Sequence, residues 1–164
     1  MTVYLADYDP EWPQKFEAER VALFEALSPW LAGDLEHIGS TAIPGMRAKS
    51  IIDIMGPVFS LEASIPAIEA ASRLQYQFYP YRPELMHWFC KPDPAFRTHH
   101  LHLVPIDSPL WRDRLRFRDR LRQSSELANE YLELKEGLVL EFPEDREAYT
   151  EGKSEFVARV LAIT

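Results

Sequence analysis

The sequence predicts an α+β fold in which helices pack against a mixed β-sheet. Three observations support it: a strongly apolar strand at residues 50–58, further strand candidates in the middle of the chain, and three helical segments at its end. The chain has 164 residues, of which 46% are hydrophobic, and no linker or repeat divides it. We therefore expect a single domain over residues 1–164.

The first part of the chain is expected to form a helix, a strand and a turn. Asp9 and Pro10 are typical helix-start residues, and apolar side chains repeat at helical spacing over residues 11–27. Residues 35–38 have the pattern of a short strand. Pro44–Gly45 then provide the residue types that a type II turn prefers at its two central positions.

The middle of the chain holds the rest of the predicted sheet. Residues 50–58 are almost wholly apolar, as in a buried strand, and a short helix is expected at residues 66–74. Further strands are expected at residues 75–81, 85–90 and 98–104. Helices are expected at residues 109–123, 126–142 and 143–162.

Composition limits the classes of function. Lys and Arg number 18 against 26 Asp and Glu, and the net charge of −8 argues against general nucleic-acid binding. Cys90 is the single cysteine, which excludes an internal disulfide and a thiolate metal cluster. The sequence has neither an apolar run of membrane-spanning length nor a secretory signal, so we expect no membrane partner and a cytoplasmic location.

Asp53 is the first candidate for a functional side chain. It lies among isoleucines in a predicted buried strand, where an unpaired carboxylate costs several kcal/mol. Strand alternation places it on the same face as Ile51 and Met55. We expect Asp53 to be a catalytic group and a cation ligand. The alternative is that it ends the buried part of the strand and caps the next loop.

His100 and His102 are the second candidates, because strand alternation places their imidazoles side by side. Together with Asp53, and with His37 and His99 elsewhere in the sheet, they supply a two-histidine, one-carboxylate site for a divalent cation such as Mg²⁺, Mn²⁺ or Zn²⁺. We expect Asp53, His100 and His102 to face one cleft. The alternative is a hydrogen-bonded structural pair of imidazoles.

Each of the last three predicted helices directs a cation toward its apolar face. At about 100° per residue, Arg114 and Arg118 fall within the apolar face of the first helix. Lys135 lies at the edge of the apolar stripe of the second helix, and Lys153 falls within that of the third. Buried Lys and Arg need counter-charges, so we expect Arg118, Lys135 and Lys153 to converge on a bound anion. The alternative is that their long stems let the charged groups reach water.

A turn at Gly39, Ser40 and Thr41 follows the first predicted strand. Its backbone N–H groups and hydroxyls can line a phosphate, or they can serve only to build the turn. Lys49 joins these candidates for phosphate binding. It is not part of a Walker A motif, because Ala48 stands where that motif requires glycine.

Four segments resemble the signature blocks of the GrpB family, and the resemblance covers nearly the whole chain. They are His-Ile-Gly-Ser-Thr-Ala-Ile-Pro-Gly-Met-Arg-Ala-Lys-Ser-Ile-Ile-Asp-Ile at residues 37–54, Thr-His-His-Leu-His-Leu at 98–103, Phe-Arg-Asp-Arg-Leu-Arg at 117–122 and Tyr-Thr-Glu-Gly-Lys-Ser-Glu-Phe at 149–156. That family in turn resembles the nucleotidyltransferase superfold of polymerase-beta type. It also occurs fused to dephospho-coenzyme A kinases in some bacteria.

The resemblance implies roles for particular residues. In the superfold, a Gly-Ser turn contacts the triphosphate, and an acid-x-acid pair with a third acid holds two metal ions. Gly39, Ser40 and Asp53 match the turn and the first acid. Met55 stands at the second acid, and the histidine strand takes the place of the third. Two-metal chemistry needs several carboxylates, so any cation is expected to be single.

These observations together lead to one functional expectation. We expect a nucleotide- or phosphoester-binding domain of nucleotidyltransferase type, whose partner is a phosphate-bearing small molecule, in the first place a nucleotide. Any metal-dependent nucleotidyl transfer is expected to be weak, because Met55 removes a carboxylate. The alternative is a non-catalytic binding or regulatory module that kept the cleft and lost the chemistry.

Overall fold

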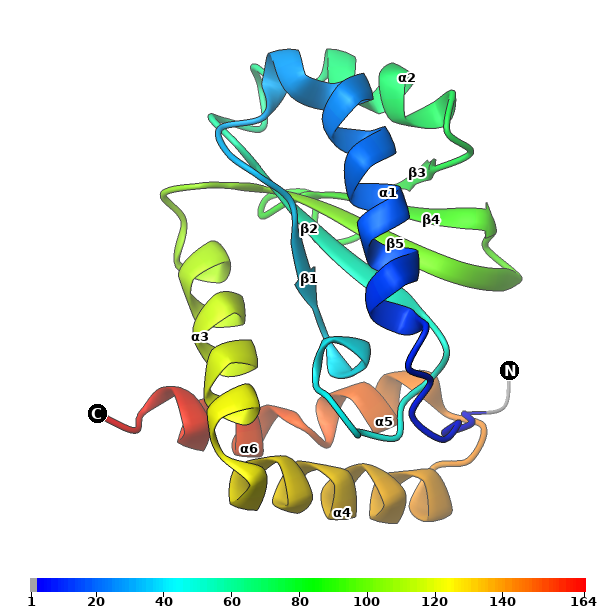
Figure 1. Ribbon diagram of the computed structural model, residues 1–164, viewed down its shortest axis with the longest axis vertical. Helices are drawn as coiled ribbons and strands as arrows, with labels where there is room; N and C mark the ends of the chain where they lie inside the picture. Colours follow the sequence, from blue (N-terminus) through cyan, green and yellow to red (C-terminus); the bar gives the residue numbers. More distant parts are fainter. Residues whose placement is uncertain (1–2) are drawn as a thin grey trace.

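The computed structural model describes residues 3–164 and has the predicted α+β architecture (Figure 1). Within that part of the chain a five-stranded sheet has the strand order β1-β2-β5-β4-β3. The strands are β1 (Glu36–Ile38), β2 (Ile52–Val58), β3 (Gln77–Tyr79), β4 (His87–Asp93) and β5 (Phe96–Pro105). β2 and β5 run parallel, whereas the other neighbouring strands are antiparallel. The sheet is therefore mixed, as the sequence predicts.

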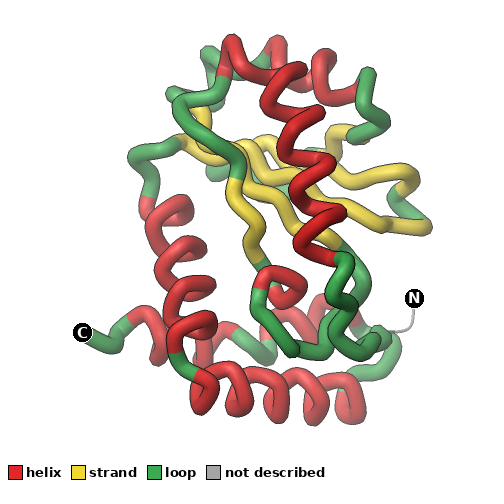
Figure 2. The backbone as a smooth tube through the Cα atoms, viewed as in Figure 1, coloured by secondary structure: helices red, strands yellow, loops and turns green. Residues whose placement is uncertain are grey.

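Helices surround this sheet on both faces and at one end. They are α1 (Trp12–Leu27), α2 (Pro66–Ser72), α3 (Pro109–Gln123), α4 (Ser125–Glu141), α5 (Arg146–Glu151) and α6 (Ser154–Leu161), together with the short 3-10 turns η1 (Ser28–Trp30) and η2 (Ser40–Ala42). α1 and α2 cover one face, where Leu23 and Leu27 pack against Ile54. α3 packs against the other face, where Trp111 contacts the cluster of Met55. Figure 2 shows α4–α6 gathered beyond one end of the strands.

The prediction of one helix over residues 143–162 was wrong, because two helices form there. α5 begins after Asp145, whose carboxylate accepts a hydrogen bond from the Ala148 N–H at 3.0 Å. It ends at Gly152, and a Cβ at that position would collide with Leu138 of α4. The glycine therefore allows α5 to end close against α4, and α6 begins after the break.

The N-terminal segment links the sheet to the last helices. The Val3 N–H donates to the Pro143 carbonyl at 2.7 Å, and Ala6 pairs with Ala48 in an antiparallel bridge. Val3 is buried in the same small apolar cluster as Tyr149 of α5. Segments from the two ends of the chain therefore meet beside the loop that precedes β2.

The expectation of no membrane partner rests on the absence of a long apolar run in the sequence. Across residues 3–164 no helix combines the length and apolar character that crossing a bilayer requires.

Candidate functional site

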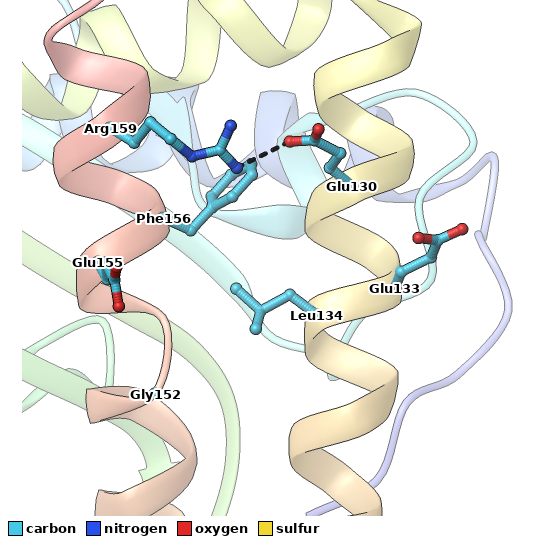
Figure 3. A pocket seen from close by; sticks show the side chains of 7 residues that line it. All are labelled: Glu130, Glu133, Leu134, Gly152, Glu155, Phe156 and Arg159. Carbon is cyan, nitrogen blue, oxygen red and sulfur yellow. Dashed lines mark hydrogen bonds and ion pairs between the residues drawn. The ribbon is translucent and has the colours of Figure 1, made fainter.

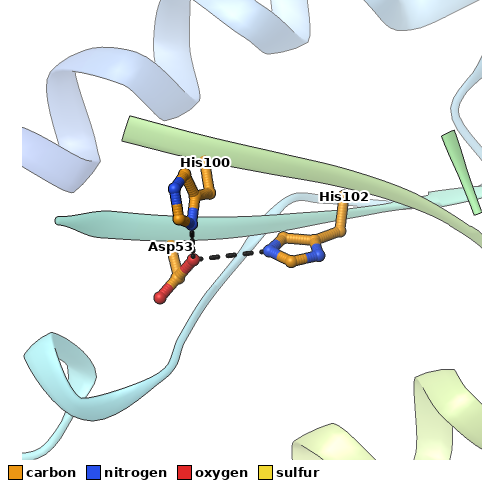
Figure 4. Close-up of side chains that lie close together, drawn as sticks. All are labelled: Asp53, His100 and His102. Atoms are coloured by element: carbon orange, nitrogen blue, oxygen red, sulfur yellow. Dashed lines mark hydrogen bonds and ion pairs between the residues drawn. The ribbon is translucent and has the colours of Figure 1, made fainter. Parts of the chain in front are cut away.

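Asp53 lies between two histidines of the neighbouring strand. In the parallel pairing of β2 and β5, Asp53 is directly opposite His100, and His102 follows two residues later on the same face. Asp53 Oδ1 lies 3.1 Å from His100 Nδ1 and 3.3 Å from His102 Nε2 (Figure 4). The structure thus brings together the three residues that the sequence predicted as cation ligands, and one ligand atom from each lies within 4.8 Å of the others.

Hydrogen bonds hold Asp53 in its ionised form. Burial alone would raise the pKa of this carboxyl, but the hydrogen bonds from His100 and His102 outweigh burial and hold the pKa well below its usual range. Burial and the nearby charge of Arg114 lower the pKa of His102 to about 4, so its imidazole is neutral at pH 7. The group is therefore an anionic carboxylate that accepts hydrogen bonds from two imidazoles.

Gly39 makes room for this carboxylate. It directly follows β1 and has a φ of +76°, a backbone conformation that favours glycine. A Cβ at this position would lie 2.6 Å from Asp53 Oδ2, well inside contact distance. The Gly39 turn and Asp53 therefore lie in contact, as the sequence predicted for parts of one site.

Lys49, Lys135 and Lys153, which we call the lysine cluster, gather around two tyrosines. Lys49 Nζ and Lys153 Nζ lie 5.2 Å and 4.8 Å from the centre of the Tyr149 ring. Lys135 Nζ lies 5.1 Å from the centre of the Tyr131 ring, and it donates a hydrogen bond to a backbone carbonyl at 2.6 Å. The three lysines come from the loop before β2, from α4 and from the start of α6, so the tertiary fold assembles them.

Repulsion and burial depress the pKa values of the lysine cluster. Burial, with the charges of Lys153 and Lys49, lowers the pKa of Lys135 to about 7. Burial and the charge of Lys153 lower the pKa of Lys49 to about 8. Burial also lowers the pKa of Lys153, while the charge of Asp53 opposes that change. Burial is the main cause at all three lysines, so the surrounding protein does not fully compensate the cost of removing these ammonium groups from water.

The hydroxyls of the predicted turn have different surroundings. Ser40 hydrogen-bonds the buried hydroxyl of Tyr131, which places it beside the lysine cluster. Thr41 is buried and lies against the protein: its Oγ1 donates to the Ile51 carbonyl at 3.1 Å and lies 2.9 Å from His37 Nε2. Ser40 thus remains a candidate for contact with a ligand, and Thr41 serves to build the turn.

A family model described as GrpB protein matches residues 2–162 of the chain. The chain belongs to the GrpB family. The crystal structure of conserved protein GrpB from Enterococcus faecalis has the same fold, with a TM-score of 0.85 at 29% identity, covering 96% of this chain and 94% of that one. Both the predicted family and the predicted fold class are therefore confirmed.

Two relatives place GrpB sequences within longer proteins. A UPF0157 protein of Pseudomonas aeruginosa is 44% identical over 162 residues, which cover 93% of this chain and 64% of that protein. A dephospho-CoA kinase of Mycolicibacterium paratuberculosis is 34% identical over 117 residues, which cover 69% of this chain and 27% of that protein. This chain thus spans less than two thirds of either relative.

In this GrpB-family chain, the structure does not bring Arg118 to the lysine cluster. Its guanidinium donates to Glu36 at 2.8 Å and to the His37 carbonyl at 3.2 Å, and it also pairs with Asp119 at 2.9 Å. Arg118 points inward, as the helical wheel predicted, but protein groups satisfy it there. A phosphate bound by Arg118 would have to compete with two carboxylates.

His37 and His99 lie on the sheet face opposite Asp53. The imidazole of His37 stacks on Phe16 of α1, with ring centres 4.8 Å apart. His99 lies edge-on to Tyr76, with ring centres 6.5 Å apart. Neither histidine therefore belongs to the group around Asp53.

Sequence reasoning left two contributors to the site unassigned. Arg114 was recognised as inward-pointing but not assigned to the histidines, yet its Nη1 lies 2.9 Å from His102 Nδ1. Tyr149 was given no role in the site, yet it is buried and lies beneath two ammonium groups. The sequence does place Arg114 on an apolar helical face, and it places Tyr149 four residues before Lys153. Neither pattern shows which distant residue each side chain contacts.

Two hollows border these groups, and they differ in charge. A groove of about 500 Å³ between α4 and α6 is lined by Glu130, Glu133 and Glu155, with Arg159 paired to Glu130 (Figure 3). Its carboxylates disfavour an anion. A larger hollow of about 780 Å³, which we call the Lys49 hollow, lies between the start of α1 and the β4–β5 turn. Its lining includes Lys49, Arg97, Trp12 and Phe96.

Proposed function

We propose that this chain binds a phosphate-bearing small molecule of the nucleotide class, with the phosphates at the lysine cluster and the rest of the ligand in the Lys49 hollow. The observation that carries the proposal is the gathering of Lys49, Lys135 and Lys153 around two tyrosines, where, in the described part of the chain, only the charges of Asp53 and Glu136 oppose theirs. A protein with a net charge of −8 otherwise has ample acids to pair its lysines.

The lysine cluster is costly to hold without an anion. Among residues 3–164, none of its three ammonium groups takes part in an ion pair. Buried like charges destabilise a fold unless something compensates them. A phosphate supplies that compensation, because each ammonium can donate a charge-assisted hydrogen bond to an anionic oxygen.

The Lys49 hollow can hold the rest of the ligand. Lys49 belongs both to its lining and to the lysine cluster, so the two regions adjoin. Phe96 lies in the lining with 71% of its surface exposed, and Arg97 lies beside it. An exposed aromatic ring next to cations suits a nucleobase, which stacks on aromatic faces whatever its sequence identity. These features favour a nucleotide over free inorganic phosphate.

One relative carries a name that fits this ligand class. The dephospho-CoA kinase of Mycolicibacterium paratuberculosis contains a segment similar to this chain. Dephospho-CoA and CoA therefore belong in the panel of ligands to test, beside the common nucleotides.

Calorimetric titration with pyrophosphate, in EDTA to remove cations, tests the lysine cluster. The Lys153→Met variant should bind at least about tenfold more weakly than wild type, since a lost charge-assisted hydrogen bond is worth about 1.5–3 kcal/mol. Arg116→Met is the control, because it removes one positive charge from the exposed face of α3 and should leave the affinity within about twofold. An equal loss of pyrophosphate affinity in both variants would show that net charge, and not the lysine cluster, determines binding.

Substitution of Phe96 tests the nucleotide class. Phe96→Ala should weaken the binding of ATP and dephospho-CoA by roughly five- to 160-fold and leave pyrophosphate binding unchanged, because stacking is worth about 1–3 kcal/mol per base. Phe59→Ala, at a residue that is 67% exposed elsewhere, is the matched control. Unchanged nucleotide affinity in Phe96→Ala would exclude the hollow as the base site.

Metal-dependent nucleotidyl transfer is the second candidate, favoured by the ionised Asp53 beside the Gly39 turn. Met55 is fully buried in an apolar cluster with Trp88 and Val104, so it offers no ligand for a second cation. We therefore expect turnover of radiolabelled nucleoside triphosphates to be weak, to prefer Zn²⁺ or Mn²⁺ over Mg²⁺, and to be lost in Asp53→Asn. Robust Mg²⁺-dependent transfer insensitive to Asp53→Asn would contradict this assignment.

A further inference from the structure

The hydrogen bond between Arg114 and His102 determines where the imidazole proton lies. A guanidinium only donates hydrogen bonds, so His102 Nδ1, 2.9 Å from Arg114 Nη1, must accept with its lone pair. A neutral imidazole carries its single proton on the other nitrogen. His102 Nε2 therefore carries the proton, and this N–H donates a hydrogen bond to Asp53 Oδ1 at 3.3 Å.

This arrangement does not fit a cation between Asp53 and the histidines. A metal ion there would need the lone pair of His102 Nε2, which would move the proton to Nδ1, directly against the Arg114 N–H. Metal-bound imidazoles normally donate their second N–H to a carboxylate, a carbonyl or water. His100 provides no such acceptor either, because its Nε2 is buried without a hydrogen-bond partner.

Arg114 itself is held weakly by the protein. Within residues 3–164 its guanidinium makes one hydrogen bond, to the neutral imidazole of His102, and it is in no ion pair. Asp53 is the acid whose charge acts on it, and the charge of Arg82 opposes that attraction. A phosphate or sulfate offers two anionic oxygens that match the guanidinium fork, which is a stronger partner than one imidazole nitrogen.

We propose that Arg114 excludes a divalent cation from Asp53, His100 and His102 until an anionic ligand draws it away, so that cation and anion bind cooperatively. Once Arg114 leaves, the His102 proton can move to Nδ1 and donate to water, and Nε2 becomes a ligand. By linkage, a bound cation then strengthens anion binding by the same factor. The cooperative half of this inference rests on the proposed anion site, whereas the exclusion of the cation does not.

Three substitutions of Arg114 separate its hydrogen-bonding character from its size. Arg114→Gln can accept a hydrogen bond from His102 Nδ1–H and should bind Co²⁺ about tenfold or more tightly than wild type, the scale on which such supporting groups change metal affinity. Arg114→Met removes the competing donor and should also tighten Co²⁺ binding. Arg114→Lys keeps a donor-only cation and should stay as weak as wild type. Far-UV circular dichroism and thermal melting check that each variant is folded.

Cobalt absorbance and calorimetry without any phosphate give the first readout. Co²⁺ affinity in Arg114→Gln and Arg114→Met no greater than in wild type would overturn the exclusion. Loss of the added Co²⁺ binding in Arg114→Gln combined with Asp53→Asn would assign it to this site, and its persistence there would overturn the assignment.

Sodium sulfate, compared with sodium chloride at equal ionic strength, gives the second readout. Sulfate should tighten Co²⁺ binding several-fold in wild type and have no effect in Arg114→Met. Equal Co²⁺ affinity of wild type in the two salts would overturn the cooperativity and leave the exclusion standing. Pyrophosphate binding in EDTA is a separate result, so failure of the lysine cluster and failure of Arg114 are distinguishable.

Discussion

The inward-pointing cations of this chain differ in whether the protein provides acidic partners for their charge. The sequence predicts inward helical positions for both Arg118 and Lys153. In the structure Arg118 contacts Glu36 and Asp119, whereas Lys153, directly before α6, faces an aromatic ring and two other lysines. A helical wheel gives the same result for both residues. The partners, which come from distant parts of the chain, decide that the first is structural and the second is a ligand candidate.

Arg118→Met should therefore lower stability and leave ligand binding intact. The variant leaves Glu36 and the His37 carbonyl without their donor, and removing one partner of such a pair costs about 1–3 kcal/mol. Urea denaturation gives the stability and pyrophosphate titration gives the affinity. Weaker binding with unchanged stability would instead restore the prediction from the sequence that Arg118 contacts phosphate.

At the scale of elements, the position of the site depends on pairings that the sequence does not state. Alternation along β5 correctly put His100 and His102 on one face, because it is a local property of a strand. The parallel pairing that sets Asp53 opposite His100 joins residues far apart in the chain, and no local pattern encodes it. For the same reason His37 and His99 were expected near Asp53, although their strands direct them to the opposite face.

The break between α5 and α6 is a second feature of this kind. Tyr149, Phe156 and Val160 keep a helical spacing, so the sequence predicts one helix. The contact of Gly152 with Leu138 is tertiary, and only the folded structure reveals that the chain bends there. The bend matters for the site because Lys153 is the next residue.

Gly152→Ala tests the importance of that bend. The added methyl group meets Leu138 and should cost about 1–3 kcal/mol through overpacking, and it should weaken pyrophosphate binding by displacing Lys153. Gly137→Ala is the control, because a Cβ there meets nothing within 4 Å and alanine favours a helix by about 1 kcal/mol. Unchanged stability and unchanged pyrophosphate affinity in Gly152→Ala would show that the contact with Leu138 does not constrain the break.

At the scale of the whole molecule, an acidic protein brings three lysines together in one region. The net charge is −8, but Lys49, Lys135 and Lys153 share one location, where the charges of Arg97 and Arg146 also act on Lys49. We expect the net negative charge to repel polyanions such as DNA, and we expect the lysine cluster to attract a small anion that can approach closely. Composition alone predicts the first effect and cannot predict the second.

The stability of the whole fold should rise with pH between about 7 and 9. The folded pKa values of Lys135 and Lys49 are about 7 and about 8, below the value of roughly 10.4 for an unfolded chain, so the unfolded chain binds more protons in this interval. Each lysine contributes at most about 1.4 kcal/mol per pH unit. Urea denaturation at pH 7 and 9 measures the slope, which Lys135→Met and saturating pyrophosphate should both reduce. If Lys135→Met leaves the slope unchanged, the pH dependence of stability comes from other groups.

The bond from Val3 to Pro143 has a consequence for the order of events during synthesis on the ribosome. The bridge between Ala6 and Ala48 can form once about a third of the chain has emerged, but the Val3 N–H must wait for residue 143. Lys49 likewise meets Lys153 and Tyr149 only after residue 153 has emerged. The lysine cluster therefore assembles late among residues 3–164, so a nascent chain cannot hold the proposed phosphate ligand before residue 153 has been made.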